Sequence, residues 1–167
     1  MSISMYQASV PIFVRALNNL SAVLEKGAAH ARAKGVEPDR LLQQRLMFDM
    51  FPLIKQVQIA CDTATRSAAR LAGVEAKPFA DTETTLAQAQ DRIKAAVAYL
   101  NTFTAAQIDG SEEHAVDMKM GKQAAHFTGL SYITTFALPN FFFHCTTAYD
   151  ILRVAGAPVG KHDYLGQ

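Results

Sequence analysis

The chain has 167 residues, enough for one domain with a full hydrophobic core and too few for two. Half of the residues are apolar and 19% are charged, which excludes an intrinsically disordered chain. The formal net charge is +1 and there is no basic run, so we expect no nucleic-acid partner. No segment reaches the about 18 apolar residues of a membrane span, and the N-terminus lacks a secretory signal. We therefore expect a cytoplasmic protein without a membrane partner, folded as a single domain over residues 1–167.

Three segments in the first part of the chain have the spacing of amphipathic helices, with apolar residues at alternating steps of three and four. They cover residues 13–31, 54–71 and 86–100. Asp81 and Thr82 offer side-chain oxygens that could cap the third helix, because the first amides of a helix lack partners within it. The segments predict three long helices, each with one apolar stripe.

The hydrophobic period changes after the third helix. Val116 and Met118 alternate with charged residues, and Gly121 interrupts the alternation before it resumes. Period two on both sides of a glycine turn predicts a β-hairpin. A last long helix begins at Tyr132 or Pro139 and ends near Val154. Four helices with narrow apolar stripes bury them by packing side by side, so we predict an all-α four-helix bundle with a small β-hairpin between the third and fourth long helices.

Polar residues on the second and last helices form the candidate ligand-binding site. In the segment F-A-L-P-N-F-F-F-H-C, Asn140 and His144 are four residues apart and share one face of a helix. Gln58 and Asp62 have the same spacing on the second helix. If these faces meet, an imidazole, two amides and a carboxylate converge inside the bundle. Tyr149 could donate a further hydrogen bond to a ligand.

Two interpretations of this polar set stay open. In the first, His144 ligates a metal such as zinc, nickel or iron, although such sites usually have about three good protein ligands and asparagine is a poor one. In the second, His144 and Asn140 satisfy buried partners, because an unpaired polar group in a core costs about 1 to 3 kcal/mol. Both place His144 inside the bundle within reach of the second helix, where burial lowers its pKa. Cys61 and Cys145 match no metal or redox spacing, so we expect buried thiols.

Four segments resemble the uncharacterised DUF1993 family: S-M-Y-Q-A-S-V-P-I-F-V-R-A-L-N-N-L, D-M-F-P-L-I-K-Q-V-Q-I-A-C-D, I-D-G-S-E and F-A-L-P-N-F-F-F-H-C-T-T-A-Y-D-I-L-R. The resemblance covers nearly the whole chain and implies a DinB/YfiT-like bundle that forms a homodimer. Many DinB-like proteins bind a divalent metal through one histidine on the second helix and an H-x-x-x-H pair on the last. Here His144 matches the second member of that pair and Asn140 replaces the first, while no histidine lies between Ala31 and Glu113.

Three hypotheses for the function follow. The first is a DinB-like bundle with an altered central pocket that binds a small molecule or, weakly, a divalent metal such as zinc or nickel. The second is a non-catalytic homodimeric binding or scaffold protein. The third is a metal- or thiol-dependent transferase-like enzyme, because some DinB-like relatives are thiol-dependent transferases or isomerases. The sequence assigns neither a substrate nor a reaction.

Overall fold

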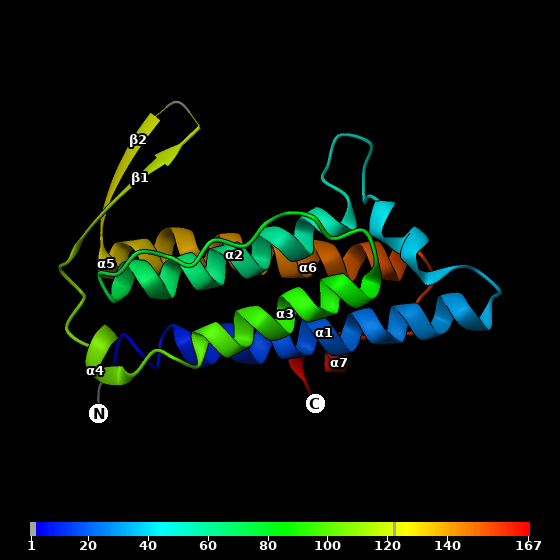
Figure 1. Ribbon diagram of the computed structural model, residues 1–167, viewed down its shortest axis with the longest axis horizontal. Helices are drawn as coiled ribbons and strands as arrows, with labels where there is room; N and C mark the ends of the chain where they lie inside the picture. The colour runs from blue at the N-terminus through cyan, green and yellow to red at the C-terminus, as the bar shows by residue number, and fades with distance from the viewer. Residues whose placement is uncertain (1–2, 122) are drawn as a thin grey trace.

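The computed structural model describes residues 3–121 and 123–167, and four long helices form its body (Figure 1). A two-stranded antiparallel hairpin stands between the third and fourth of these helices, so the predicted architecture is confirmed. The long helices are α1 (Val10–Ala33), α2 (Leu53–Leu71), α3 (Leu86–Leu100) and α6 (Leu138–Val154). The hairpin strands are β1 (Ala115–Met120) and β2 (Gln123–Thr128), and the short elements are η1 (Pro38–Gln43), α4 (Ala105–Ile108), α5 (Gly129–Ser131), η2 (Tyr132–Ala137) and α7 (Lys161–Leu165).

The long helices are arranged in the order α1, α3, α2, α6 around the bundle, and α6 closes the ring against α1. Figure 1 shows α1 and α6 running in one direction and α2 and α3 in the other. The two middle helices are parallel because residues 72–85 return along the whole length of α2 before α3 begins. This return segment brings its own polar side chains beside α2.

The start of α3 is fixed by side-chain caps on its first amides. Thr85 Oγ1 accepts a hydrogen bond from the third residue of the helix, and its own amide is bonded in return. Asp39, from η1, accepts a further bond from the amide of Leu86 at 2.7 Å. The prediction that Asp81 or Thr82 caps this helix was wrong, because both lie in the return segment ahead of the cap.

The last helix is one continuous rod built from α5, η2 and α6, so both predicted starting points lie inside it. Its middle segment, η2, is π-helical, which means that the turns there are wider than in an α-helix. Pro139, the second residue of α6, has no amide hydrogen to continue the regular ladder of helix hydrogen bonds. At the rod's start, a Cβ on Gly129 would lie 2.0 Å from the carbonyl oxygen of Ser111, so this close approach requires glycine.

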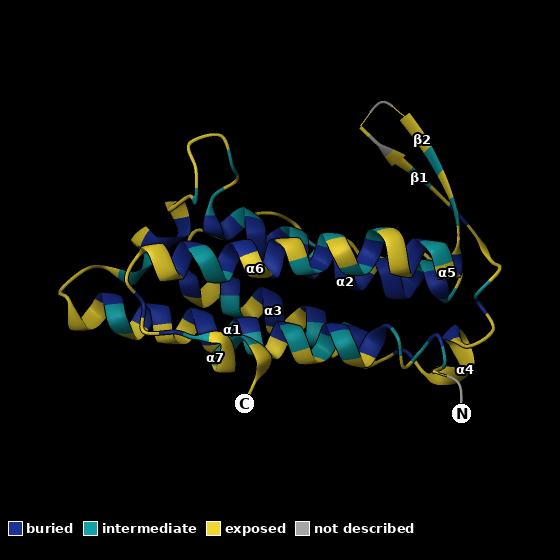
Figure 2. Ribbon diagram, turned by 180° about the vertical axis from the view of Figure 1, so that it is seen from behind, coloured by how far each residue is buried: buried dark blue, intermediate teal, exposed yellow. Residues whose placement is uncertain are grey.

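Buried side chains form one core between the helices. Figure 2 colours the ribbon of these residues dark blue. The hairpin joins this core at its base, where Val116 pairs with Phe127. Phe127 packs against Tyr132 and Phe136 of η2 with ring centroids 5.9 and 6.0 Å away. No helix in the described part of the chain is long and apolar enough to cross a membrane.

Candidate functional site

His144 lies inside the bundle against α2, as predicted, and is 8% exposed. Its Nδ1 is 2.7 Å from Oε1 of Gln56, whose Nε2 donates to the carbonyl oxygen of Phe51 at 3.0 Å. Because that second bond fixes the amide orientation, Oε1 is the acceptor and Nδ1 carries the hydrogen. Burial lowers the pKa of His144, so the neutral imidazole with Nδ1–H is the favoured form.

Asn140 also faces α2, where its Nδ2 donates to Thr63 Oγ1 at 3.0 Å. Sequence reasoning missed both α2 partners, Gln56 and Thr63. The signal was present: they are seven residues apart, about two helical turns, and so lie on one face of α2. The structure thus gives both predicted polar residues of α6 a hydrogen-bonded partner.

Gln58 and Asp62 do not join His144, and the predicted convergence of the four side chains was wrong. Gln58 is two residues after Gln56, a rotation of about 200° around the helix, so it points to the opposite side of α2. There Gln58 Nε2 donates to Glu83 at 2.8 Å, and Asp62 Oδ1 lies 2.6 Å from Arg92. The second predicted pair therefore belongs to the seam between α2 and α3, although Asp62 and Asn140 line one hollow beside α2.

Arg92, which sequence reasoning missed, organises that seam. Its side chain is 1% exposed, and its guanidinium nitrogens lie 2.6, 3.0 and 2.9 Å from Asp62, Asp81 and Glu83. Partial burial of Glu83 opposes its ionised form, but hydrogen bonds from Arg92 and Gln58 hold its pKa below the ordinary value. Because Arg92 falls between Ala89 and Ala96 on the apolar stripe of α3, its position already indicated a buried charge that needs partners.

The polar side chains around His144 and Arg92 do not fit the ligand set of a first-row metal centre. Within residues 3–121 and 123–167 there is no group of three or more His, Cys, Asp or Glu side chains that could hold a metal ion. His144 is hydrogen-bonded to the amide of Gln56, and the three carboxylates of the α2–α3 seam surround a guanidinium. No chemical step is therefore assigned to a metal in this protein.

Both cysteines are buried free thiols, as predicted. Burial raises the pKa of Cys61 to about 12, although the charge of the adjacent Arg92 works against the rise. Burial also raises the pKa of Cys145. Neither thiol has appreciable thiolate character at neutral pH, so neither is an activated nucleophile.

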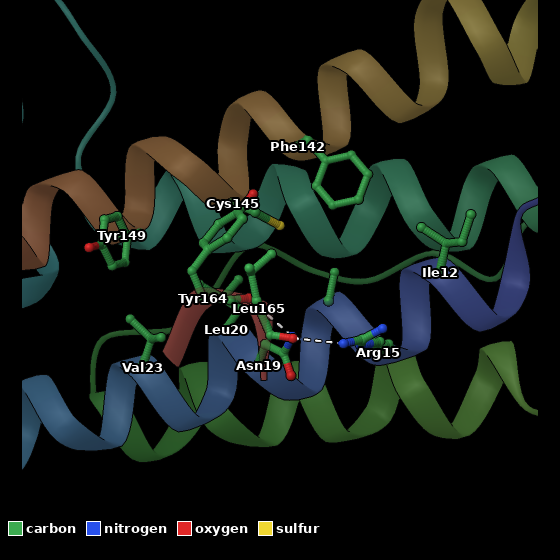
Figure 3. A pocket seen from close by; sticks show the side chains of 11 residues that line it. Ile12, Arg15, Asn19, Leu20, Val23, Phe142, Cys145, Tyr149, Tyr164 and Leu165 are labelled. Carbon is green, nitrogen blue, oxygen red and sulfur yellow. Dashed lines mark hydrogen bonds between the residues drawn. The ribbon is translucent and has the colours of Figure 1, made fainter. Parts of the chain in front are cut away.

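A mostly apolar pocket of about 220 Å³ lies between α1 and α6, and His144 does not line it (Figure 3). Its walls are side chains from the two long helices, and α7 covers it from outside. Of the predicted site residues only Tyr149 lines it, because Tyr149 is five positions after His144 and points to another side of the helix. The lining residues are Ile12, Arg15, Ala16, Asn19, Leu20, Val23, Phe142, Cys145, Tyr149, Tyr164 and Leu165.

The short helix α7, which covers this pocket, is attached mainly by polar bonds to α1. Arg15 donates to the carbonyl oxygen of Leu165 at 2.9 Å, and Asn19 donates to that of Tyr164 at 3.1 Å. Lys26 forms an ion pair with Asp163 farther along α1. On the α6 side, the Tyr164 ring packs edge to face with Tyr149, with centroids 5.7 Å apart. A few partly exposed contacts thus hold α7 in place.

Comparisons with known proteins agree with this architecture. The family model described as DUF1993, a domain of unknown function, matches residues 5–165. The crystal structure of a DinB family member protein from Shewanella denitrificans is 42% identical, with a TM-score of 0.89, and the match covers 97% of this chain and 92% of that one. The search of curated proteins found no match. The chain therefore belongs to the DUF1993 family and has the DinB-like four-helix fold.

Proposed function

We propose that this protein binds a small molecule in the pocket between α1 and α6, beneath α7. The observation that carries the proposal is the pocket's composition: an apolar cavity with Arg15 and Asn19 among its lining residues. Ligand sites are typically apolar cavities with a few well-placed polar groups. An engineered apolar cavity of about 150 Å³ is enough to hold benzene, so 220 Å³ suits a single ring or a short alkyl chain.

The polar residues define the other end of the ligand. Arg15 and Asn19 are hydrogen-bond donors. A guanidinium has five N–H groups, and Arg15 uses one of them for its bond to the carbonyl oxygen of Leu165. A ligand with a carboxylate or carbonyl oxygen at one end matches these donors. Binding is proposed in preference to catalysis because burial raises the pKa of two titratable lining groups, the Cys145 thiol and the Tyr164 hydroxyl, and so disfavours their deprotonated, nucleophilic forms.

Calorimetric titration with hexanoate and hexanol tests this proposal. Both probes have a short alkyl chain, and only hexanoate carries the anionic group that Arg15 favours. We expect Ala16→Phe, which fills the pocket from α1, to weaken both probes at least about tenfold, or about 1.4 kcal/mol. Arg15→Gln should weaken hexanoate more than hexanol, because it removes the cation that only the carboxylate needs.

The matched control is Ala22→Phe, which adds the same side chain to an exposed position of α1 outside the pocket. It should bind both probes as the wild-type protein does. Equal affinity in wild type, Ala16→Phe and Ala22→Phe would overturn the assignment of the pocket.

A second candidate function, the non-catalytic homodimer, is supported by exposed apolar side chains. Met47, Phe48 and Phe51 are 54%, 88% and 55% exposed in the segment before α2, and Phe143 is 54% exposed on α6. Exposed apolar groups of this size mark protein interfaces when they gather in one patch. Light scattering after size-exclusion chromatography should give twice the monomer mass for wild type and the monomer mass for Phe48→Ser. A monomeric wild-type protein would exclude this candidate.

A further inference from the structure

A second hollow, independent of the proposed ligand pocket, lies between α2, the η2–α6 rod and the hairpin. It has a volume of about 400 Å³. Unlike the α1–α6 pocket it is lined largely by charged and hydrogen-bonding groups. Its residues are Lys55, Ile59, Asp62, Thr63, Arg66, Arg70, Asp81, Met118, Lys119, Tyr132, Phe136 and Asn140. We call it the hairpin groove.

Charge pairing around the hairpin groove leaves an excess of positive charge. Three cations and three carboxylates form one connected set of ion pairs, which balances to zero: Lys55, Arg66 and Arg92 with Asp62, Asp81 and Glu83. Arg70 and Lys119 also line the groove. Within the described residues, no carboxylate lies within ion-pair distance of either one. The groove therefore has two positive charges beyond the balanced set.

Arg70 is held in place by neutral groups. Its NH1 donates to the hydroxyl oxygen of Tyr132 at 2.9 Å, and that oxygen lies 2.9 Å from Ser67 Oγ in the core. The guanidinium carbon also lies 5.6 Å from the centre of the Tyr132 ring. Tyr132 is 1% exposed and opens the π-helical segment, so it forms a rigid support. A positioned guanidinium loses less conformational entropy when it binds an anion than a free side chain does.

A neutral donor completes the groove. Thr63 Oγ1 accepts a hydrogen bond from Asn140, so its own hydrogen can be donated to another acceptor. Lys119 comes from β1, on the opposite wall, and is exposed. The groove thus brings hydrogen-bond donors from α2 and the hairpin to one cavity without a free carboxylate to compete for them.

We infer that the hairpin groove binds an oxyanion, the phosphate or carboxylate group of a small molecule, with Arg70 as its main contact. Arg70 offers a planar donor pair to two oxygens, Lys119 adds charge from the hairpin, and Thr63 donates a hydrogen bond. The carboxylates nearest to the site, Asp62 and Asp81, are neutralised by the ion pairs that hold them.

Calorimetric titration with pyrophosphate and, separately, citrate tests this inference at low ionic strength. We expect millimolar or tighter binding of at least one anion, weakened by added salt because the contact is between charges. Arg70→Gln should weaken it at least about tenfold. Tyr132→Phe keeps the charge but removes the hydroxyl support, so it should weaken binding to a smaller extent. Circular dichroism spectra confirm that each variant is folded.

The matched control is Arg32→Gln, which removes an exposed arginine of α1 outside the groove, and it should leave the affinity within about twofold of wild type. Binding of pyrophosphate alone identifies a phosphate site, and binding of citrate alone identifies a carboxylate site. No binding of either anion to the wild-type protein would overturn the inference. An affinity unchanged by Arg70→Gln would overturn it as well.

Discussion

The α2–α3 seam and the α1–α6 seam are built by helices of the same bundle, yet they are filled in opposite ways. Between α2 and α3, the buried guanidinium of Arg92 pairs with Asp62 of α2 and with Asp81 and Glu83 of the return segment, which closes the seam from outside. Between α1 and α6, apolar side chains leave a cavity, and a short helix covers it through a few polar bonds. An ion-paired seam leaves no space for a further molecule, whereas an apolar cavity under a short surface helix can bind one.

The largest expected effect comes from breaking the charged seam. Arg92→Met removes the central cation and leaves Asp62, Asp81 and Glu83 close together, so we expect a loss of about 3 to 5 kcal/mol in the free energy of unfolding. Urea unfolding followed by circular dichroism measures it. Arg66→Met is the control, because Arg66 pairs with the same Asp62 from an exposed position, and it should cost at most about 1 kcal/mol. Equal losses in the two variants would mean that burial gives Arg92 no special role.

The reaction rates of the two cysteines measure how accessible each of the two seams is. Cys145 lines the α1–α6 pocket, whereas Cys61 lies beside Arg92. Removal of residues 161–167 takes away the cover, so we expect Cys145 to react with iodoacetamide at least about tenfold faster and Cys61 to keep its rate. Mass spectrometry of timed samples distinguishes the two sites. If both rates rise together, α7 stabilises the whole bundle and is not a local cover.

The contact between α2 and α6 contains His144 and should make the stability of the bundle depend on pH. Its pKa in the folded protein is lowered by burial, so the unfolded chain takes up the proton first as the pH falls below about 6.5. The free energy of unfolding should decrease from that pH until the folded protein is protonated too. Urea unfolding between pH about 7.5 and about 5.5 should show a smaller decrease in His144→Gln than in wild type. The exposed His126→Gln serves as the control and should keep the wild-type decrease.

Sequence periodicity predicted the long helices and the hairpin because each has a regular apolar pattern that repeats every turn or every second residue. The same pattern placed His144 in the core. It failed for Gln58 and Asp62 because i, i+4 spacing shows that two residues share a face and does not say which neighbour that face meets. The return segment decided that question, since its length makes α2 and α3 parallel neighbours and brings Glu83 to Gln58.

The apolar pocket was harder to predict from the sequence. Its lining residues, such as Leu20 and Phe142, have the spacing of ordinary core residues, and a cavity arises only where facing side chains fail to fill the space. Tyr149 was named as a candidate, but the pocket that it lines is completed by α7, and the short sequence of α7 has no strong pattern. Arg92 could have been found, because a charged residue on an apolar stripe is visible in the sequence.

The smallest expected effect concerns Gly27, where α1 packs tightly against Leu152 of α6. A Cβ on Gly27 would lie 2.7 Å from the end of the Leu152 side chain, which can move slightly. Alanine favours a helix over glycine by about 1 kcal/mol, which offsets the crowding, so Gly27→Ala should change the free energy of unfolding by less than about 1 kcal/mol. Gly129→Ala is the comparison, because the group in its way is a backbone carbonyl. A large loss in Gly27→Ala would show that the α1–α6 seam is as tightly closed as the other.

A crystal structure of the protein with hexanoate tests most directly whether the α1–α6 pocket holds a small molecule. We predict electron density for the alkyl chain between Leu20 and Phe142, with the carboxylate toward Arg15, and an empty pocket in Ala16→Phe crystals soaked in the same way. Hexanoate bound only elsewhere, or an empty wild-type pocket at a concentration that saturates binding in solution, would contradict it.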